Sequence, residues 1–264
     1  MNVNFKLRSR NLTPDLPTLI CLGLIAIGCG GSGGGISQTA TVTAGLIHEW
    51  KFNGDATDSV GALNASVVGA ATHINTNSGQ AIVLDGQTMG INVQPVPDMQ
   101  FQASFTISAW ANLYALPSGG KLWSSLIFDG DDRAGFDAYF ISVDPQANLE
   151  FGICSQASNN NGVSTGGTMP LNQWVFITAT YDKAAGTMRL YQNGQLVSQL
   201  LNNKTLTPVC ALDPSANPGI GIGVNNDFPH SSSNYGWDGA ISDVRIYNRA
   251  LSASQISALY NQGN

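Results

Sequence analysis

The strongest constraint on the fold is a series of short runs in which apolar and polar residues alternate with a period of two. In residues 105–113, FTISAWANL, the side chains of Phe105 and Ile107 fall on one face of a strand, and the side chain of Trp110 falls on the other. Similar runs recur from residue 45 onward, and this alternation is typical of half-buried β-strands. Only 11% of the residues are charged and 30 are glycine, which argues against a helical bundle. We therefore expect an all-β fold.

The clearest strand pair lies in residues 174–199. Asn193 and Gly194 separate MRLYQ from QLVSQ. Both residue types tolerate the positive φ angles that a type I′ turn requires, and Asn-Gly is the strongest short-range signal for a hairpin. The sequence thus predicts an antiparallel hairpin that turns at Asn193 and Gly194.

The run AISDVRIYN, residues 240–248, predicts a strand near the end of the chain. Ile241, Val244 and Ile246 are available to the core after a small irregularity near Ser242. We expect this strand to pair with the first one, because a sheet sandwich commonly protects its edges in this way.

A helical segment follows this strand. Ser252 and Gln255 have the spacing of a capping box. Ile256, Leu259 and Tyr260 fall on one face of a helix. We therefore expect the chain to close its sandwich and then to cap it with a short C-terminal helix.

The N-terminus has the features of an export signal. A basic region that contains Lys6, Arg8 and Arg10 precedes an apolar run of ten residues, LICLGLIAIG. This run is too short to cross about 30 Å of hydrocarbon. We interpret residues 1–28 as a signal peptide that is removed from the mature chain.

The residues around Cys29 resemble the lipobox of bacterial lipoproteins, although Ala26 and Ile27 depart from its usual residues. A lipid on Cys29, followed by a flexible Gly/Ser-rich linker over residues 29–44, predicts a cell-envelope lipoprotein of the outer membrane or cell surface. The membrane is then a partner through the lipid anchor only. The alternative is a plain secretory signal and a secreted protein.

Export leaves Cys154 and Cys210 in the folded part of the chain. In an oxidising compartment two cysteines most often pair, so we predict a disulfide between them. The alternative is two buried thiols.

The charge of the mature chain limits its partners. Without residues 1–28 the sequence holds 8 basic and 16 acidic residues, a net charge of −8. This balance argues against nucleic acid and anionic lipid as partners. It is compatible with calcium and with neutral sugars.

Five segments resemble, in order and spacing, the laminin-G-like domains of the concanavalin A-like lectin/glucanase superfamily. They are GLIHEWKFNGDATDSVGALNASV, AIVLDG, FTISAWANL, QWVFITATYDKAAGTMRLYQNGQLV and WDGAISDVRIYNRALSASQISALY. The resemblance covers residues 45–261 and implies one domain over residues 45–264. It implies a jelly-roll β-sandwich of two curved antiparallel sheets, used to bind sugars and proteins. A fold alone does not give a function.

The superfamily includes hydrolases, which makes the carboxylates informative. Members related to laminarinases carry an E-x-D-x-E strand that places two glutamates about 5 Å apart. This chain contains only Glu49 and Glu150, which lie in separate predicted strands. His48, His73 and His230 lack the spacing of zinc ligands. We therefore expect no catalytic residues.

The resemblance also implies a structural calcium ion, which takes oxygen ligands from carboxylates, amides and carbonyls. Carried over to this sequence, the ligands are Asn53, Asp55, Asp58 and Asp243. The alternative is that Asp58 caps a turn and that Asp243 forms a salt bridge with Arg245 or Arg249.

Sugar recognition needs an aromatic ring on which a pyranose stacks, together with polar partners for its hydroxyls. The predicted aromatic residues border loop-like sequence and are Trp123, Tyr235 and Trp237. The predicted polar partners are Asn160, Asn225 and Asn226. The remaining tryptophans, Trp50, Trp110 and Trp174, lie inside the strand motifs and are predicted to belong to the core.

These observations predict an exported module that binds a polysaccharide or a glycoprotein and has no catalytic activity. The second hypothesis is a surface module that binds protein for adhesion or assembly, and the third is an enzyme of the glycoside hydrolase type. Exposed aromatic rings with amide neighbours favour sugar, and a flat apolar patch favours protein. Paired carboxylates across a cleft favour an enzyme.

Overall fold

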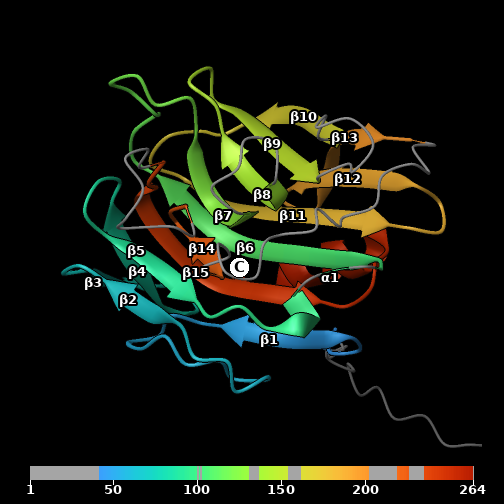
Figure 1. Ribbon diagram of the computed structural model, residues 1–264, viewed down its shortest axis with the longest axis horizontal. Helices are drawn as coiled ribbons and strands as arrows, with labels where there is room; N and C mark the ends of the chain where they lie inside the picture. The colour runs from blue at the N-terminus through green and yellow to red at the C-terminus, as the bar shows by residue number, and fades with distance from the viewer. Residues whose placement is uncertain are drawn as a thin grey trace, which may run out of the picture. The chain divides into compact units, whose positions relative to one another are not determined.

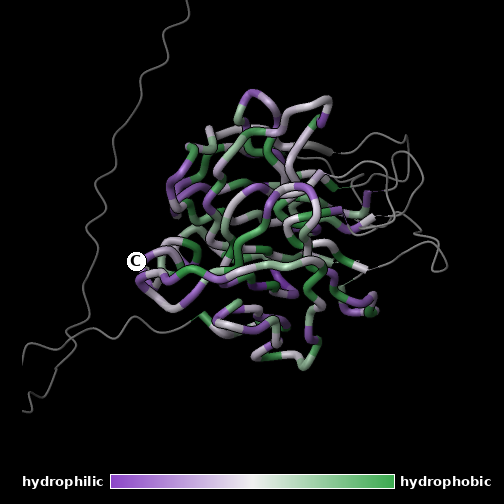
Figure 2. The backbone as a smooth tube through the Cα atoms, turned by 90° about the vertical axis from the view of Figure 1, so that its left-hand side faces the viewer, coloured by the Kyte–Doolittle hydropathy of each residue, from purple (hydrophilic) through white to green (hydrophobic). Residues whose placement is uncertain are grey.

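The computed structural model describes residues 42–99, 101, 103–130, 137–153, 162–201, 219–225 and 235–263. These residues belong to one compact unit, Thr39–Asn264. They form two antiparallel sheets packed face to face, as Figure 1 shows. Figure 2 turns the same molecule by 90° and shows hydrophobic and hydrophilic residues interspersed along the chain.

The first sheet has eight strands. Seven follow one another in the order β13 (Gln195–Leu200), β12 (Thr187–Gln192), β11 (Trp174–Asp182), β6 (Phe105–Leu113), β15 (Asp238–Tyr247), β4 (Gly79–Asp85) and β3 (Thr72–Thr76). The eighth, β1 (Leu46–Trp50), pairs with β15.

The second sheet has seven strands. Their order is β10 (Gly162–Thr168), β9 (Asn148–Ile153), β8 (Asp137–Val143), β7 (Ser124–Gly130), β14 (Ile220–Ile222), β5 (Gly90–Val93) and β2 (Ser66–Val68). A single 3-10 turn, η1 (Pro97–Met99), and one α-helix, α1 (Ala253–Gln262), complete the described elements. The predicted all-β sandwich with a short C-terminal helix is confirmed.

The local sequence signals are confirmed where the structure describes them. The hairpin between β12 and β13 turns at Asn193 and Gly194, whose φ angles are 51° and 76°. The first and last strands pair, and the register of β15 against β6 shifts between Ser242 and Arg245. Ser252 accepts a hydrogen bond from the Gln255 backbone N–H, and the reciprocal contact completes the capping box of α1.

One strand lies in a stretch whose composition is typical of a loop. Residues 155–167 are rich in Asn, Ser and Gly, yet β10 covers Gly162–Thr168. Its backbone pairs with β9, for example Val163 opposite Gly152. Pairing with a neighbouring strand has overridden a weak local preference for strand.

The main core lies between the two sheets. It includes Phe105, Ile107 and Ala109 of β6 together with Tyr139 and Ile141 of β8. The alternation in the sequence correctly predicted the inward face of β6.

A second, smaller core lies on the outer face of the eight-stranded sheet. Ile256 and Leu259 of α1 pack there with Trp110, Phe176 and other apolar side chains. All nine residues of β6 are buried, because this second core covers part of the outward face as well. The helix therefore acts as a partial third layer.

Several sequence-based predictions lie outside the described residues. They are the signal peptide (residues 1–28), the lipidated Cys29, the disulfide between Cys154 and Cys210, and the side chains of Asn160 and Asn226. Within the described part of the chain, no helix is long and apolar enough to cross a membrane.

Candidate functional site: a groove on the outer face of the larger sheet

Two adjoining cavities form a groove on the outer face of the eight-stranded sheet. One has a volume of about 410 Å³ and the other of about 240 Å³. They share three lining residues, Ser78, Ser242 and Gly263, and are therefore continuous. We call the first cavity the aromatic end of the groove and the second the charged end.

The floor of the groove follows from the strand register. Trp110 of β6 lies opposite Ser242 of β15 and opposite Phe176 of β11. Because Ile107 and Ala109 of β6 face the main core, Trp110 points outward. Trp174 lies on the same face, diagonal to Trp110 across the pair of β6 and β11. Neighbouring strands thus present two indole rings to one cavity.

Two segments wall the aromatic end. One is the turn between β3 and β4, residues 75–78, which contributes two asparagines, a threonine and a serine. The other is the end of α1 at Gly263. The Trp110 ring is held in place by Tyr260, with a centroid distance of 5.7 Å, and by Phe176, with a centroid distance of 5.2 Å. The floor of the groove is therefore rigid, and its rim is rich in amides and hydroxyls.

Gly263 closes tightly on the floor. A Cβ atom at this position would lie 2.3 Å from Trp110 Nε1, a distance that real atoms do not adopt. The absence of a side chain lets the backbone lie directly over the indole nitrogen, so glycine is required by close approach.

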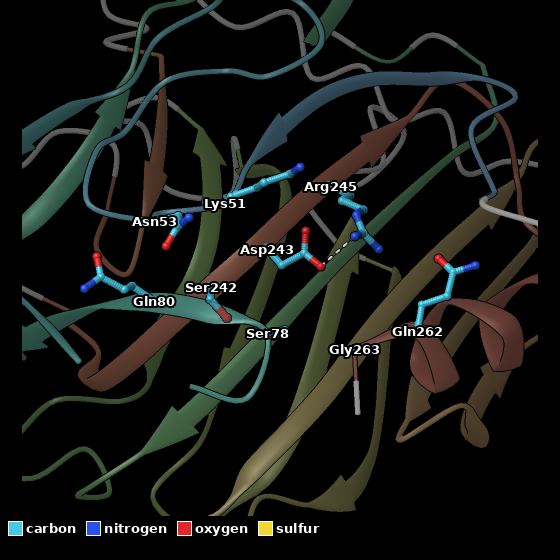
Figure 3. Close-up of a pocket in the computed structure, with 9 residues that line it drawn as sticks. All are labelled: Lys51, Asn53, Ser78, Gln80, Ser242, Asp243, Arg245, Gln262 and Gly263. Carbon is cyan, nitrogen blue, oxygen red and sulfur yellow. Dashed lines mark ion pairs between the residues drawn. The ribbon is translucent and has the colours of Figure 1, made fainter. Parts of the chain in front are cut away.

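Ion pairs link the charged side chains at the charged end. Arg245 donates from Nη2 to Asp243 Oδ2 at 2.7 Å, as Figure 3 shows. It also donates from Nε to Glu49 Oε1 at 2.9 Å. Lys51 Nζ lies 3.5 Å from Glu49 Oε2. Asn53 and Gln80 lie beside these groups in the same cavity. Two positive and two negative side chains therefore balance one another.

Asp243 has an unusual backbone and an incompletely used carboxylate. Its φ angle is 52°, a left-handed conformation that is uncommon outside glycine and that concentrates at functional sites. Its Oδ1 atom is buried and has no hydrogen-bond partner in the described structure. Burial raises the pKa of Asp243, although the nearby Arg245 lowers it. The carboxylate can therefore accept a further hydrogen bond.

The four predicted calcium ligands do not come together as one set. Asn53 and Asp243 line the charged end of the groove. Asp58 is buried in the loop after β1, and Asp55 is exposed, where it accepts hydrogen bonds from the backbone and the hydroxyl of Thr57. Among the described residues, no group of three or more His, Cys, Asp or Glu could hold a metal ion.

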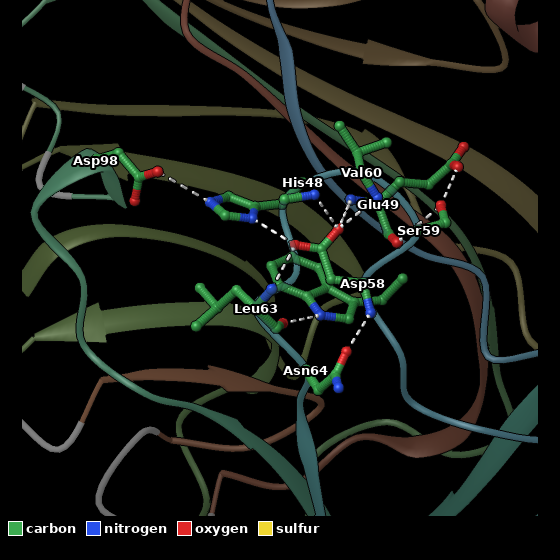
Figure 4. Close-up of polar contacts among 10 residues, drawn as sticks. His48, Glu49, Asp58, Ser59, Val60, Leu63, Asn64 and Asp98 are labelled. Atoms are coloured by element: carbon green, nitrogen blue, oxygen red, sulfur yellow. Dashed lines mark hydrogen bonds and ion pairs between the residues drawn. The ribbon is translucent and has the colours of Figure 1, made fainter.

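Donor groups surround the carboxylate of Asp58 (Figure 4). Its Oδ1 accepts hydrogen bonds from the backbone N–H groups of Glu49, Val60 and Gly61, and its Oδ2 accepts one from that of Leu63. Its Oδ2 also lies 2.6 Å from the ring Nδ1 of His48. Burial alone raises the pKa of a carboxyl group, but these hydrogen bonds outweigh it and lower the pKa of Asp58 to about 2.

This geometry agrees with the alternative reading in which Asp58 caps a turn and Asp243 pairs with Arg245. Groups that donate hydrogen bonds repel a cation, so Asp58 does not fit a calcium site as it is arranged here. Calcium binding by this chain stays a prediction. A chelator that lowers the melting temperature would support it.

Two of the predicted sugar-binding aromatic residues form a pair away from the groove. The rings of Trp123 and Tyr235 stack with a centroid distance of 4.5 Å, and both are partly exposed. Asn225 lies close by, because its side-chain oxygen accepts a hydrogen bond from Ser125 in β7, the strand that follows Trp123. The structure thus brings three predicted residues close together.

The third predicted aromatic residue, Trp237, is fully buried in the main core. Its Nε1 donates a hydrogen bond to the backbone oxygen of Asn112 at 3.3 Å. The prediction that its ring stacks on a ligand does not agree with the structure. Trp237 lies directly before β15, at the point where the chain enters the sheet. Its ring packs into the main core there.

The core assignment of the other tryptophans is confirmed for Trp50 and for Trp110. Trp50 is fully buried, Trp110 is 7% exposed and belongs to the second core, and Trp174 is partly buried against that core. Trp110 and Trp174 also line the groove. The outward position of Trp110 could be predicted from the alternation of residues 105–113. It places Trp110 on the other face of the strand from Phe105 and Ile107. The groove itself could not be predicted, because the cover on that face comes from α1 and from a turn far away in the sequence.

The fold is an antiparallel β-sandwich with a groove on the outer face of its larger sheet. A family model described as the concanavalin A-like lectin/glucanases superfamily, of the laminin G type, matches residues 85–257. The chain belongs to this superfamily. A search of curated protein sequences found no match.

Solved structures with the same fold include binding domains of larger proteins. Domain 4 of AbnA, a GH43 extracellular arabinanase from Geobacillus stearothermophilus in complex with arabinotriose, is 22% identical, with a TM-score of 0.62, and the match covers 82% of this chain and 98% of that chain. The binding domain of botulinum neurotoxin DC in complex with SialylT is 16% identical, with a TM-score of 0.63 and coverage of 83% and 52%. The binding domain of Paraclostridial Mosquitocidal Protein 1 is 18% identical, with a TM-score of 0.64 and the same coverage. This chain spans about half the length of the two toxin domains, and identities at this level show the fold alone.

Proposed function

We propose that this protein is a carbohydrate-binding module whose ligand lies in the groove on the outer face of the eight-stranded sheet. The observation that carries the proposal is the partly exposed ring of Trp174, which lines one cavity together with the mostly buried ring of Trp110 and a rim of amides and hydroxyls. Apolar faces of sugar rings stack on indoles, and sugar hydroxyls need donors and acceptors at the edge of such a platform.

The structural neighbours support this reading at the level of ligand class. One of them is an arabinanase domain in complex with arabinotriose, and another is a toxin binding domain in complex with SialylT. We extend the proposal to a module of the cell envelope, exported by residues 1–28 and anchored through Cys29. The sequence features of the N-terminus support this part.

We further propose that the module has no catalytic activity of its own. Glu49 lies in β1 of the first sheet and pairs with Arg245, whereas Glu150 lies in β9 of the second sheet, near Ser142. Hydrolysis of a glycosidic bond uses two carboxyl groups that flank the bond. The two glutamates are held on different sheets and do not form such a pair.

The test compares two tryptophan variants on a glycan array, followed by titration calorimetry with the glycans that bind. W174A removes a partly exposed ring from the groove, and we expect it to weaken binding by about tenfold or more, the usual scale for truncating a central aromatic contact. The matched control is W123A, which removes a partly exposed ring from the other aromatic pair and should leave the affinity unchanged.

Two results would overturn the proposal. Loss of binding in W123A with full binding in W174A would move the site to the pair of Trp123 and Tyr235. Failure of the wild-type protein to bind any glycan would favour the second function, a module that binds protein. The specific observation for that function is the exposed apolar tip made by Leu122 beside the stacked pair, since Leu122 is 59% exposed.

A further inference from the structure

The charged end of the groove is built to be electrically neutral. Lys51, Arg245 and Asp243 line this cavity. Glu49 does not line it, but it pairs with both cations, so that two negative charges offset two positive ones. Hydrogen bonds from Ser59 and Arg245 outweigh the effect of burial and lower the pKa of Glu49, which keeps this carboxylate ionised. A ligand in the groove therefore meets charges that already have partners.

An acidic sugar gains little from such a site. Its carboxylate would have to compete with Glu49 and Asp243 for the guanidinium of Arg245, whose side chain is only 14% exposed. It would also lose hydration on entering the groove. A charge that leaves water without gaining a free partner costs free energy.

A hydroxyl group is better suited to the same place. Asp243 keeps acceptor capacity, because its Oδ1 has no partner among the described residues. Asn53 and Gln80 offer amide donors and acceptors within the same cavity. A hydrogen bond from a neutral hydroxyl to a carboxylate is one of the stronger kinds, and it needs no counter-ion.

Resting on the proposed function, we infer that the groove selects uncharged oligosaccharides and that Asp243 accepts a hydrogen bond from a ligand hydroxyl at its charged end. The two cavities together, about 410 and 240 Å³, give room for more than one sugar unit. One unit stacks at the aromatic end, and the next reaches the charged end. The ligand is thus a neutral oligosaccharide or the end of a neutral polysaccharide.

D243N is the variant that tests this inference. Asparagine is among the residues that best tolerate a left-handed backbone, so the φ angle of 52° at this position is retained. The substitution removes one negative charge and leaves Lys51 and Arg245 in excess. The control is D55N, which removes the same charge from an exposed residue that does not line the groove.

The measurement is the affinity of each protein for galactotriose, cellotriose and arabinotriose, which are neutral, and for trigalacturonate, which is acidic. We expect the wild-type protein and D55N to prefer at least one neutral trisaccharide. D243N should lose about tenfold or more of that affinity, the scale of a hydrogen bond to a charged group, and should gain in relative affinity for trigalacturonate. The readout is the ratio of the affinity for the neutral trisaccharide to the affinity for trigalacturonate. A general loss of folding lowers both affinities and does not reverse this ratio.

The outcomes separate this inference from the proposed function. If W174A abolishes binding of a trisaccharide while D243N keeps the wild-type ratio of neutral to acidic ligand, the groove binds sugar but Asp243 does not select it. Equal or tighter binding of trigalacturonate by the wild-type protein overturns the inference in the same way. If the wild-type protein binds none of the four, the proposed function and the inference both fail.

Discussion

Asp58 illustrates how one buried carboxylate organises the loop after the first strand. It gathers four backbone N–H groups and the ring of His48, whose other nitrogen, Nε2, lies 3.4 Å from Asp98. Buried donors of this kind are costly when they lack a partner. The loop that leads from β1 toward the groove therefore depends on a single side chain for its shape.

We predict that D58N destabilises the fold in a pH-dependent way. The pKa of Asp58 in the folded state is about 2, below its ordinary value of 3.8, so the carboxylate stabilises the protein at pH values above about 4 and this contribution is lost as the pH falls toward 2. At pH 7 the variant should lose about 2 kcal/mol of unfolding free energy. At pH 2 the difference from the wild-type protein should nearly vanish.

Urea denaturation at several pH values measures this difference. D55N serves as the control, because Asp55 is exposed and its contacts are to Thr57 alone among the bonds described for it. A D58N protein as stable as the wild type at pH 7 would show that the hydrogen bonds around Asp58 do not hold the loop.

Single residues were the part of the site that the sequence predicted least well. Asp58 and Asp243 stood out as acids in a family pattern, but their roles depend on what approaches each carboxylate in the fold. His48 and Leu63 reach Asp58 across the loop, and Arg245 reaches Asp243 across a bulge. The sequence left two roles open for these acids, calcium ligands or a turn cap and an ion pair. The choice between them depends on local geometry that residue types and spacing do not encode.

At the level of elements, local chemistry explains most of the structure. The alternation in β6, the Asn193-Gly194 turn and the Ser252 capping box are each encoded within a few residues, and all three were predictable. The groove was not, because its walls are the turn between β3 and β4 and the end of α1, which are more than 180 residues apart. Only the packing of α1 on the outer face of β6 brings them together.

The helix α1 therefore contributes to the site as well as to the fold. We predict that S252A destabilises the helix and weakens glycan binding. Loss of the N-cap should cost about 1 kcal/mol of stability. It should also lower hydrogen-exchange protection of the amides of α1. The expected effect on glycan affinity is a decrease, because Gly263 at the end of the helix covers Trp110.

The control for this experiment is S257A, which changes a serine within α1 that is not its cap. Alanine has the higher helix propensity, so this variant should keep or slightly raise the stability. Unchanged protection of the helix in S252A would indicate that packing in the second core, rather than the cap, fixes the end of α1.

At the scale of the whole molecule, the two sheets have different surroundings. The eight-stranded sheet is covered on its inner face by the main core and on part of its outer face by α1, and the groove occupies the space next to the helix. Among the described residues, this arrangement gives the eight-stranded sheet a partly aromatic groove. We therefore place the ligand there and not at the exposed pair of Trp123 and Tyr235.

The five tryptophans of the chain allow that claim to be tested in one measurement. Each indole N–H gives its own signal in a proton–nitrogen NMR spectrum, and a glycan identified on the array is titrated into the labelled protein. We predict that the signals of Trp110 and Trp174 shift with the ligand, while those of the core residues Trp50 and Trp237 stay in place. A shift confined to Trp123, with the two groove tryptophans unchanged, would contradict the account.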